Sequence, residues 1–433
     1  MAVAAAVGRR PRPSLSTQAR AALVTTPGKL RLLSVVVVAA ILLVWIADLA
    51  AVSQRQRGVT AFRDQGDLVV LAQHVQTELT DADAGAANAF LAGGLEPPDQ
   101  VARYVDGTTA AADDLAQAAS DAGTSGPAGA AIRSLSEQLQ TYIGLVATAQ
   151  ADNRQGFPIG AAYLRSASAL LHTSVLPAAA SLAEISAGRL NQAEDRATGA
   201  TDVAEVVLTT LLLLGLLVVT QGFVTRRTRR ALNLGLAAAT LVALILAVVV
   251  LSDLGSERAA VVTGGEHGYA SVARLTAARV LAFQAQGDES EALIARGNGQ
   301  SDESDLDADV ARVKTLVDQA TISATAADLS GAQPALSAWQ AVDAKIRALD
   351  NGGQHDAAVT LALGHATGDS LPAFDVFDAS MATAITAEQQ SFLSQSSKAH
   401  KSLDPLSVIA TIGAVLAAAA ALAGIQVRVN EFR

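Results

Sequence analysis

The chain of 433 residues contains no cysteine, which excludes disulfides, thiolate nucleophiles and cysteine-based metal sites. Aromatic residues make up only 3% of the sequence, whereas 51% of the residues are hydrophobic and alanine is abundant. Alanine is the strongest helix former, and small side chains let helices pack closely. The composition therefore gives little support for a sheet and predicts an all-α fold.

Four long apolar stretches stand out from an otherwise polar chain whose mean hydropathy is +0.33. They cover residues 33–52, 206–224, 232–251 and 406–427. Each has the ~20 residues that a helix needs to cross the hydrocarbon core of a bilayer. We therefore predict four transmembrane helices, with a loop of only seven residues, 225–231, between the second and the third.

The charges divide along the same boundaries. The short loop holds Arg226, Arg227, Arg229 and Arg230, and residues 1–32 hold six bases and no acid. Residues 53–205 carry 18 acids and 9 bases, and residues 253–404 carry 21 acids and 10 bases. Because basic residues concentrate in short cytoplasmic loops, both termini should lie in the cytoplasm of a plasma-membrane protein. A cleaved signal peptide is the alternative for the first stretch, but that run is too long and lacks a clear Ala-x-Ala site.

Turn residues divide each large segment into four expected helices. Breaks fall near residues 96–99, 123–127 and 153–158 in the first segment, and near 296–299, 330–334 and 351–353 in the second. The two segments look like an internal repeat, since Leu176-Pro177 in the first occupies a position that corresponds to Leu371-Pro372 in the second. We predict two tandem extracytoplasmic four-helix bundles, with these boundaries: cytoplasmic basic tail 1–32, span 33–52, bundle 53–205, span 206–224, Arg-rich loop 225–231, span 232–251, bundle 252–405, span 406–427 and cytoplasmic tail 428–433.

Four residues are candidates for coupling the bundles to the membrane. Pro177 and Pro372 are each predicted inside a fourth helix, where proline removes a backbone hydrogen bond and bends the helix. They are either a static bend or a hinge beside a ligand pocket near residues 172–177 and 368–372. Asp48 and Asp253 lie at the outer ends of the first and third spans, as water-boundary residues or as polar contacts with the bundles.

No motif in the sequence predicts catalysis or a cofactor. The acidic run at residues 302–309 resembles the start of a calcium loop but lacks the required Gly and Glu, and it suits the start of a helix better. The six histidines form no metal-binding pair. The acidic large segments are unsuited to nucleic acid. We therefore expect a non-enzymatic membrane protein without cofactor or metal.

Paired helical bundles bracketed by membrane helices resemble the ligand-binding regions of bacterial chemoreceptors and sensor kinases. With only short cytoplasmic segments and the Arg226–Arg230 loop, the layout resembles the actinobacterial four-span GlnX family more closely. This resemblance implies a relay that receives amino-acid availability from an extracytoplasmic glutamine- or glutamate-binding lipoprotein. It also implies a cytoplasmic partner, the serine/threonine kinase named protein kinase G.

The function predicted from the sequence is a transmembrane signal relay that senses a nutrient through a solute-binding lipoprotein. Arg226, Arg227, Arg229 and Arg230 are the expected contacts with the cytoplasmic kinase. The alternatives are a scaffold of the cell envelope and a transport accessory, neither of which would switch between two states. Small residues at Gly235 and Gly413 predict a close approach of the third and fourth spans.

Overall fold

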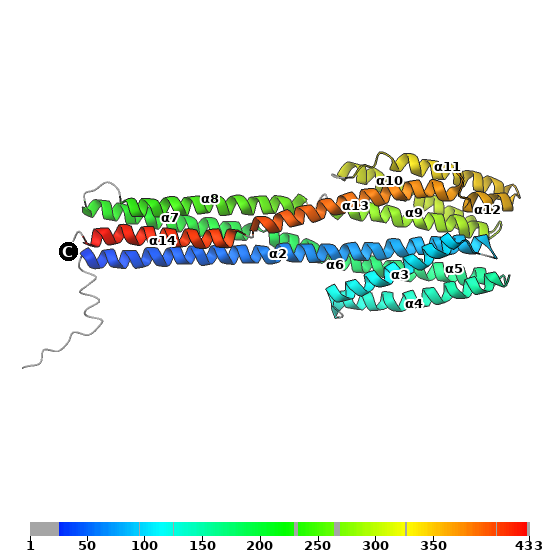
Figure 1. Cartoon of the computed structure of the whole chain (residues 1–433), viewed down its shortest axis with the longest axis horizontal. Helices are drawn as coiled ribbons and strands as arrows, with labels where there is room; N and C mark the ends of the chain where they lie inside the picture. Colours follow the sequence, from blue (N-terminus) through cyan, green and yellow to red (C-terminus); the bar gives the residue numbers. More distant parts are fainter. Residues whose placement is uncertain are drawn as a thin grey trace, which may run out of the picture. The chain divides into compact units, whose positions relative to one another are not determined.

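The computed structural model describes residues 26–94, 96–123, 125–228, 233–263, 269–324, 327–403 and 405–430. Over these residues all regular secondary structure is helical and there is no strand, which confirms the predicted all-α class. Four helical stretches are long and apolar enough to cross a membrane, which indicates a multi-pass membrane protein. The chain divides into two compact units, and each is described by itself (Figure 1).

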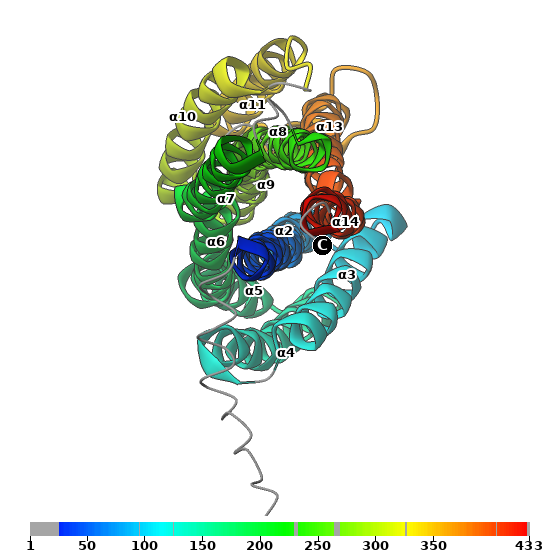
Figure 2. The same ribbon diagram turned by 90° about the vertical axis from the view of Figure 1, so that its left-hand side faces the viewer.

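The first unit contains the four apolar stretches and is formed by three separate parts of the chain, Met1–Arg57, Gly199–Arg258 and Ala399–Arg433. Its helices are the N-terminal part of α2 (Thr26–Ala92), α7 (Ala200–Thr228), α8 (Leu234–Thr263) and α14 (Leu406–Asn430). Seen end-on, the helices follow one another around the unit in the order α2, α7, α8, α14 (Figure 2). The predicted spans 33–52, 206–224 and 406–427 lie within α2, α7 and α14, and residues 234–251 of the third predicted span lie within α8.

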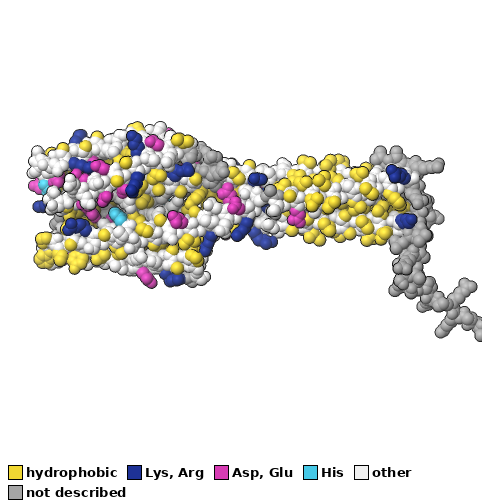
Figure 3. All heavy atoms as spheres, turned by 180° about the vertical axis from the view of Figure 1, so that it is seen from behind, with side chains coloured by type: hydrophobic (Ala, Val, Ile, Leu, Met, Phe, Trp, Pro, Cys, Tyr) yellow, Lys and Arg dark blue, Asp and Glu magenta, His cyan; other side chains and the backbone are white. Residues whose placement is uncertain are grey.

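Hydrophobic side chains lie both inside and outside this unit. Val37, Leu217 and Leu236 are buried between the helices, whereas Leu212 and Val248 are more than half exposed. Figure 3 shows a face of the unit that is hydrophobic over most of its length. A helix bundle in water would not leave so many large apolar side chains uncovered, whereas lipid requires such a surface.

The helices α8 and α14 approach each other closely through glycine. A Cβ atom at Gly235 would lie 2.5 Å from the carbonyl oxygen of Ala420 and 2.5 Å from the Cα of Gly424. Asn233, just before α8, donates a hydrogen bond of 2.8 Å to the carbonyl of Gly424. The close approach of the third and fourth spans through small residues is confirmed, although Gly413 faces Leu246 of α8 rather than another small residue.

A fully buried ion pair joins three segments of the first unit. Arg55 in α2 donates to Glu257 in α8 over 2.6 Å, and neither side chain is exposed. The same guanidinium donates to the carbonyl of Gly199, between α6 and α7, over 2.8 Å. Arg55 and Glu257 follow the predicted ends of the first and third spans. The pair therefore fixes the helices where they are expected to leave the membrane.

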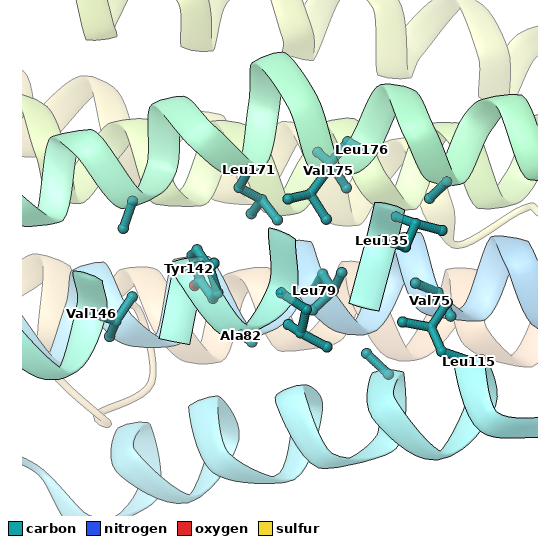
Figure 4. Close-up of a cluster of buried hydrophobic side chains, with 14 of the residues drawn as sticks. Val75, Leu79, Ala82, Leu115, Leu135, Tyr142, Val146, Leu171, Val175 and Leu176 are labelled. Carbon is teal, nitrogen blue, oxygen red and sulfur yellow. The ribbon is translucent and has the colours of Figure 1, made fainter. Parts of the chain in front are cut away.

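The second unit consists of two lobes, one in each large segment. The first lobe, residues 58–198, contains the C-terminal part of α2, α3 (Pro98–Ala122), α4 (Gly126–Arg154), α5 (Gly160–Leu170), a π-helical turn η1 (Leu171–Val175) and α6 (Leu176–Thr198). The predicted breaks at 96–99, 123–127 and 153–158 agree with these bounds. Figure 4 shows Leu171 and Val175 of η1 directed into the same core as Leu79 and Tyr142.

The second lobe, residues 259–398, has an aromatic core. It contains the end of α8, α9 (Ala270–Ile294), α10 (Gln300–Ser323), α11 (Ala332–Asn351), α12 (His355–Leu363) and most of α13 (Ser370–Leu403). Phe374 lies at its centre, with ring centroids 5.3 Å from Phe283 and 5.2 Å from Trp339. Aromatic pairs at such distances add to the stabilisation from burial alone.

The two Leu-Pro pairs have different structural settings. In the first lobe, Pro177 is the second residue of α6 and follows η1, in which the N–H of Leu176 bonds the carbonyl of Leu171. In the second lobe the expected continuous fourth helix is wrong, because α12 ends at Leu363 and α13 begins at Ser370. Pro372 therefore lies in the first turn of α13, where the missing N–H costs no helical hydrogen bond.

Candidate functional site: a polar network between the two lobes

The predicted site residues are distributed over both units. Arg226 is exposed near the C-terminal end of α7 and Arg227 follows it in the helix, while Arg229 and Arg230 lie outside the described residues. Asp48 is buried in the first unit, and Asp253 is only half-buried. The roles expected of these residues stay predictions. Of the predicted positions, Pro177 follows His172 by five residues and Pro372 follows Ser370 by two, so both lie close in sequence to polar residues described below.

A buried carboxylate, Asp83, is the centre of the first lobe's polar residues. It lies on α2 and accepts hydrogen bonds from the Tyr142 hydroxyl at 3.0 Å and from the Ser168 hydroxyl at 3.2 Å. The imidazole Nε2 of His172 lies 3.7 Å from its second oxygen. His172 belongs to η1, so the π-helical turn carries one side chain to this carboxylate and two others into the apolar core.

Burial controls the protonation of these groups. It raises the pKa of Asp83 to about 6, although the hydrogen bonds from Tyr142 and Ser168 oppose the change. Glu291, on α9 of the other lobe, has its pKa raised to about 7 by burial and then by the charge of Asp83. Burial lowers the pKa of His172, against the attraction of Glu291 and two acids of α10. This part of the network therefore changes its proton content near neutral pH.

The two lobes are joined by buried hydrogen bonds between amide and hydroxyl groups. Ser290 on α9 donates to the Asn88 side-chain oxygen on α2 over 2.5 Å. The Asn88 amide in turn donates to Gln100 on α3 over 3.2 Å. Both Asn88 and Ser290 are only 1% exposed. Because an unmatched buried polar group costs about 1–3 kcal/mol, this chain of bonds favours one arrangement of the lobes.

Two arginines enclose Phe283 at the same interface. Arg103 on α3 bonds Asp81, and it also donates to Gln286 on α9 over 2.8 Å. Its guanidinium carbon lies 5.2 Å from the centre of the Phe283 ring, and that of Arg279 lies at the same distance. A cation over an aromatic face within about 6 Å is attracted to it. Arg103 thus connects the first lobe to an aromatic residue of the second lobe's core.

A second buried carboxylate lies inside the second lobe. Glu289 on α9 accepts a hydrogen bond of 2.8 Å from Ser370, at the start of α13. Ser370 in turn accepts one of 3.0 Å from the Trp339 indole. Burial and the nearby charge of Asp343 raise the pKa of Glu289 to about 8. Each lobe thus connects one buried acid to a buried aromatic residue, Asp83 to Tyr142 in the first lobe and Glu289 through Ser370 to Trp339 in the second.

The chemistry available to the network is hydrogen bonding and proton exchange. Ser168, His172 and Asp83 come together, but Ser168 donates to the carboxylate and not to the imidazole. This order differs from that of a nucleophilic triad, in which the histidine lies between serine and acid. Within the described ranges, no three His, Asp or Glu side chains are placed to hold a metal ion.

Comparison with known protein families identifies a match to the first lobe. Residues 59–195 match the model of a family described as the actinobacterial sensor domain. The matched range begins within α2 and ends within α6, so it corresponds to the first lobe and includes Asp83, Asn88, Tyr142, Ser168 and His172. No curated protein and no solved structure matches the chain.

Proposed function

We propose that the chain is a non-enzymatic membrane sensor that relays a signal from outside the cell to a cytoplasmic partner. The observation that carries this proposal is the match of residues 59–195 to an actinobacterial sensor domain. The matched region begins inside α2, and the same uninterrupted helix contains the first apolar stretch. A change in the lobe at α2 therefore has a direct helical connection to the membrane segment.

The proposed signal acts on the interface between the lobes. A ligand or partner can shift a protein between two states only by binding one state more tightly than the other. The bonds from Asn88 to Ser290 and from Arg103 to Gln286 stabilise one arrangement of the lobes. An external partner that favours a different arrangement would break these bonds and displace α2 by an ångström or two, as helices at packed interfaces commonly do.

The partners in this proposal follow from the charge pattern and the family resemblance. The lobes are two extracytoplasmic four-helix bundles that receive amino-acid availability from a solute-binding lipoprotein. The cytoplasmic reader is a serine/threonine kinase that contacts Arg226, Arg227, Arg229 and Arg230. A hinge at Pro177 beside η1 fits this scheme, since π-helical turns occur often at functional sites.

The orientation can be tested directly because the natural chain has no cysteine. Single cysteines at Arg133, Lys345 and Arg226 would be treated with a membrane-impermeant maleimide in intact cells. We expect labelling at the first two positions without permeabilisation, and labelling at Arg226 only after it. Labelling of Arg133→Cys or Lys345→Cys only after permeabilisation would refute a sensor that faces the outside.

The relay can be tested with the full chain in nanodiscs. Binding of the candidate lipoprotein, loaded with amino acid or empty, would be measured for the natural chain and for Asn88→Ala. Ser136→Ala, whose hydroxyl bonds only the carbonyl one turn earlier in α4, is the matched control. We expect loading to change the affinity, and Asn88→Ala to reduce that difference. Equal affinity in both states would instead favour a scaffold.

A further inference from the structure

The first unit contains a small, partly open cavity lined by residues from all four of its helices. The cavity is lined by Trp45 and Asp48 of α2, by Thr210 of α7 and otherwise by aliphatic side chains of α2, α7, α8 and α14. About 30 Å³ of it is open to the centres of water molecules. Since one water needs about 10–15 Å³ by this measure, the cavity has room for about two.

Asp48 is the acidic residue in this lining. The residue is 7% exposed, and its Oδ1 atom is buried without a hydrogen-bond partner among the protein atoms. The neighbouring indole does not supply one, because Trp45 donates to the Thr411 hydroxyl on α14 over 3.2 Å. A buried carboxyl within an apolar stretch therefore forms part of the wall of a space that can hold water, and one of its oxygens has no partner among the protein atoms.

The residues around Asp48 indicate whether a basic side chain, a metal ion or a proton with water could stabilise its carboxyl group. Facing Asp48, α7 presents Thr210 and Leu213, and α8 and α14 present only aliphatic side chains. The lining therefore contains no second titratable group and no basic residue to pair with a carboxylate. A hard metal ion needs about six oxygen ligands, far more than one carboxyl and one hydroxyl supply. A proton on the carboxyl, with a bonded water, requires no further ligand.

We propose that Asp48 and this cavity form an intramembrane proton-binding site, in which a protonated carboxyl is bonded to water between the four spans. Loss of the proton would leave a charge that neither the lining nor the lipid can compensate. The packing of the four helices would then depend on proton concentration. This inference concerns the first unit alone and holds whether or not the lobes bind an external partner.

The test uses the full chain in nanodiscs and dicyclohexylcarbodiimide, which adds to protonated carboxyl groups in apolar surroundings. Mass spectrometry would measure the labelled fraction of Asp48 between about pH 5 and pH 9, with half-buried Asp253 as the control within the chain. We expect strong labelling of Asp48 at low pH. Above the midpoint the label should fall about tenfold for each pH unit, as loss of one proton requires.

Two further measurements keep the inference testable if the reagent cannot enter the cavity. The infrared carbonyl band of a protonated carboxyl should be present in the natural chain, absent in Asp48→Asn and lost at high pH. Labelling should be the same in sodium chloride and choline chloride. If sodium protected Asp48 from labelling, the site would bind a metal cation and not a proton, and the proposal would be overturned. Absence of both the label and the carbonyl band would overturn it as well.

Discussion

Replacement of Glu289 by glutamine should stabilise the protein increasingly as pH rises. Glu289 is buried, and burial and the charge of Asp343 raise its pKa from 4.5 to about 8. Between these values the folded chain holds a proton that the unfolded chain has released. The natural protein therefore loses stability as pH rises from about 4.5 to about 8. Glutamine keeps a similar shape and an oxygen for the Ser370 hydroxyl, but it cannot ionise.

The expected effect is large enough to measure. The difference between a pKa of 4.5 and one of about 8 corresponds to roughly 5 kcal/mol of free energy of unfolding. At pH 7 the natural protein should already have lost about 3 kcal/mol of this free energy of unfolding. The stability advantage of Glu289→Gln should therefore grow by about 1.4 kcal/mol for each pH unit in this range. Near pH 4.5 the two proteins should differ little.

Two assays address this prediction in full chain reconstituted into nanodiscs. Thermal unfolding would be followed at several pH values, with Glu137→Gln, an exposed acid of α4, as the matched control. Trp339 fluorescence supplies a local probe, since the indole is linked through Ser370 to Glu289 and only one other tryptophan, Trp45, needs replacement by phenylalanine. A fluorescence midpoint near 4.5, or a stability difference that does not change with pH, would refute the reasoning.

Three further predictions concern packing inside one or the other of the two units, and thermal unfolding tests each of them. Tyr142→Phe should lower the free energy of unfolding by about 1–3 kcal/mol at pH 8, and by less at pH 5, where the Asp83 carboxyl that Tyr142 bonds is neutral. An equal loss of stability at both pH values would contradict this prediction. Arg55→Ala should cost about 3–5 kcal/mol, and the double variant Arg55→Met, Glu257→Leu should recover most of it, so a double variant as unstable as the single one would argue against the ion pair. Gly235→Leu should separate α8 from α14 and lower the unfolding temperature, whereas Gly215→Leu, which meets nothing within 4 Å, should not.

The sequence was sufficient for features with a local signal. A membrane span needs only a long apolar run, and a helix boundary needs only proline or glycine next to a periodic segment. The apolar stripe of α4 has a signal of the same local kind, because its members recur every three or four residues and all are buried: Ile132, Leu135, Leu139, Tyr142 and Val146. Such signals depend on neighbouring residues and not on the rest of the fold.

The polar network was missed because its partners are far apart in the chain. Asn88 and Ser290 are 202 residues apart, and nothing in either neighbourhood indicates the other. A partial signal existed for Glu289, because it follows the buried positions 275, 278, 282 and 285 at helical spacing. An acid on such an apolar stripe is a candidate for a buried, perturbed group. Its partners still required the tertiary structure.

Pro177 and Pro372 show why a proline in the sequence does not by itself predict whether the fourth helix of each lobe is continuous. The same Leu-Pro pair follows a π-helical turn in one lobe and opens a new helix in the other. Before Pro372 the chain turns through Gly364 and Gly368, and Gly368 has a φ of 104° that other residues rarely adopt. The residues before each proline, and not proline alone, therefore determine whether the helix continues.

The π-helical turn also lets the first lobe hold one residue more than an ordinary helix would. Buried positions 167, 171, 175 and 179 recur every four residues, more slowly than the 3.6 residues of an ordinary helical turn. Deleting one residue from Leu171–Val175 would restore an ordinary helix, in which about 11 residues cover the three turns that 12 residues cover here. Ala179 and Leu182 would then stay on the face that packs into the core. Homologous chains that lack one residue here should consequently keep the same face of α6 apolar and lose only the π-helical turn.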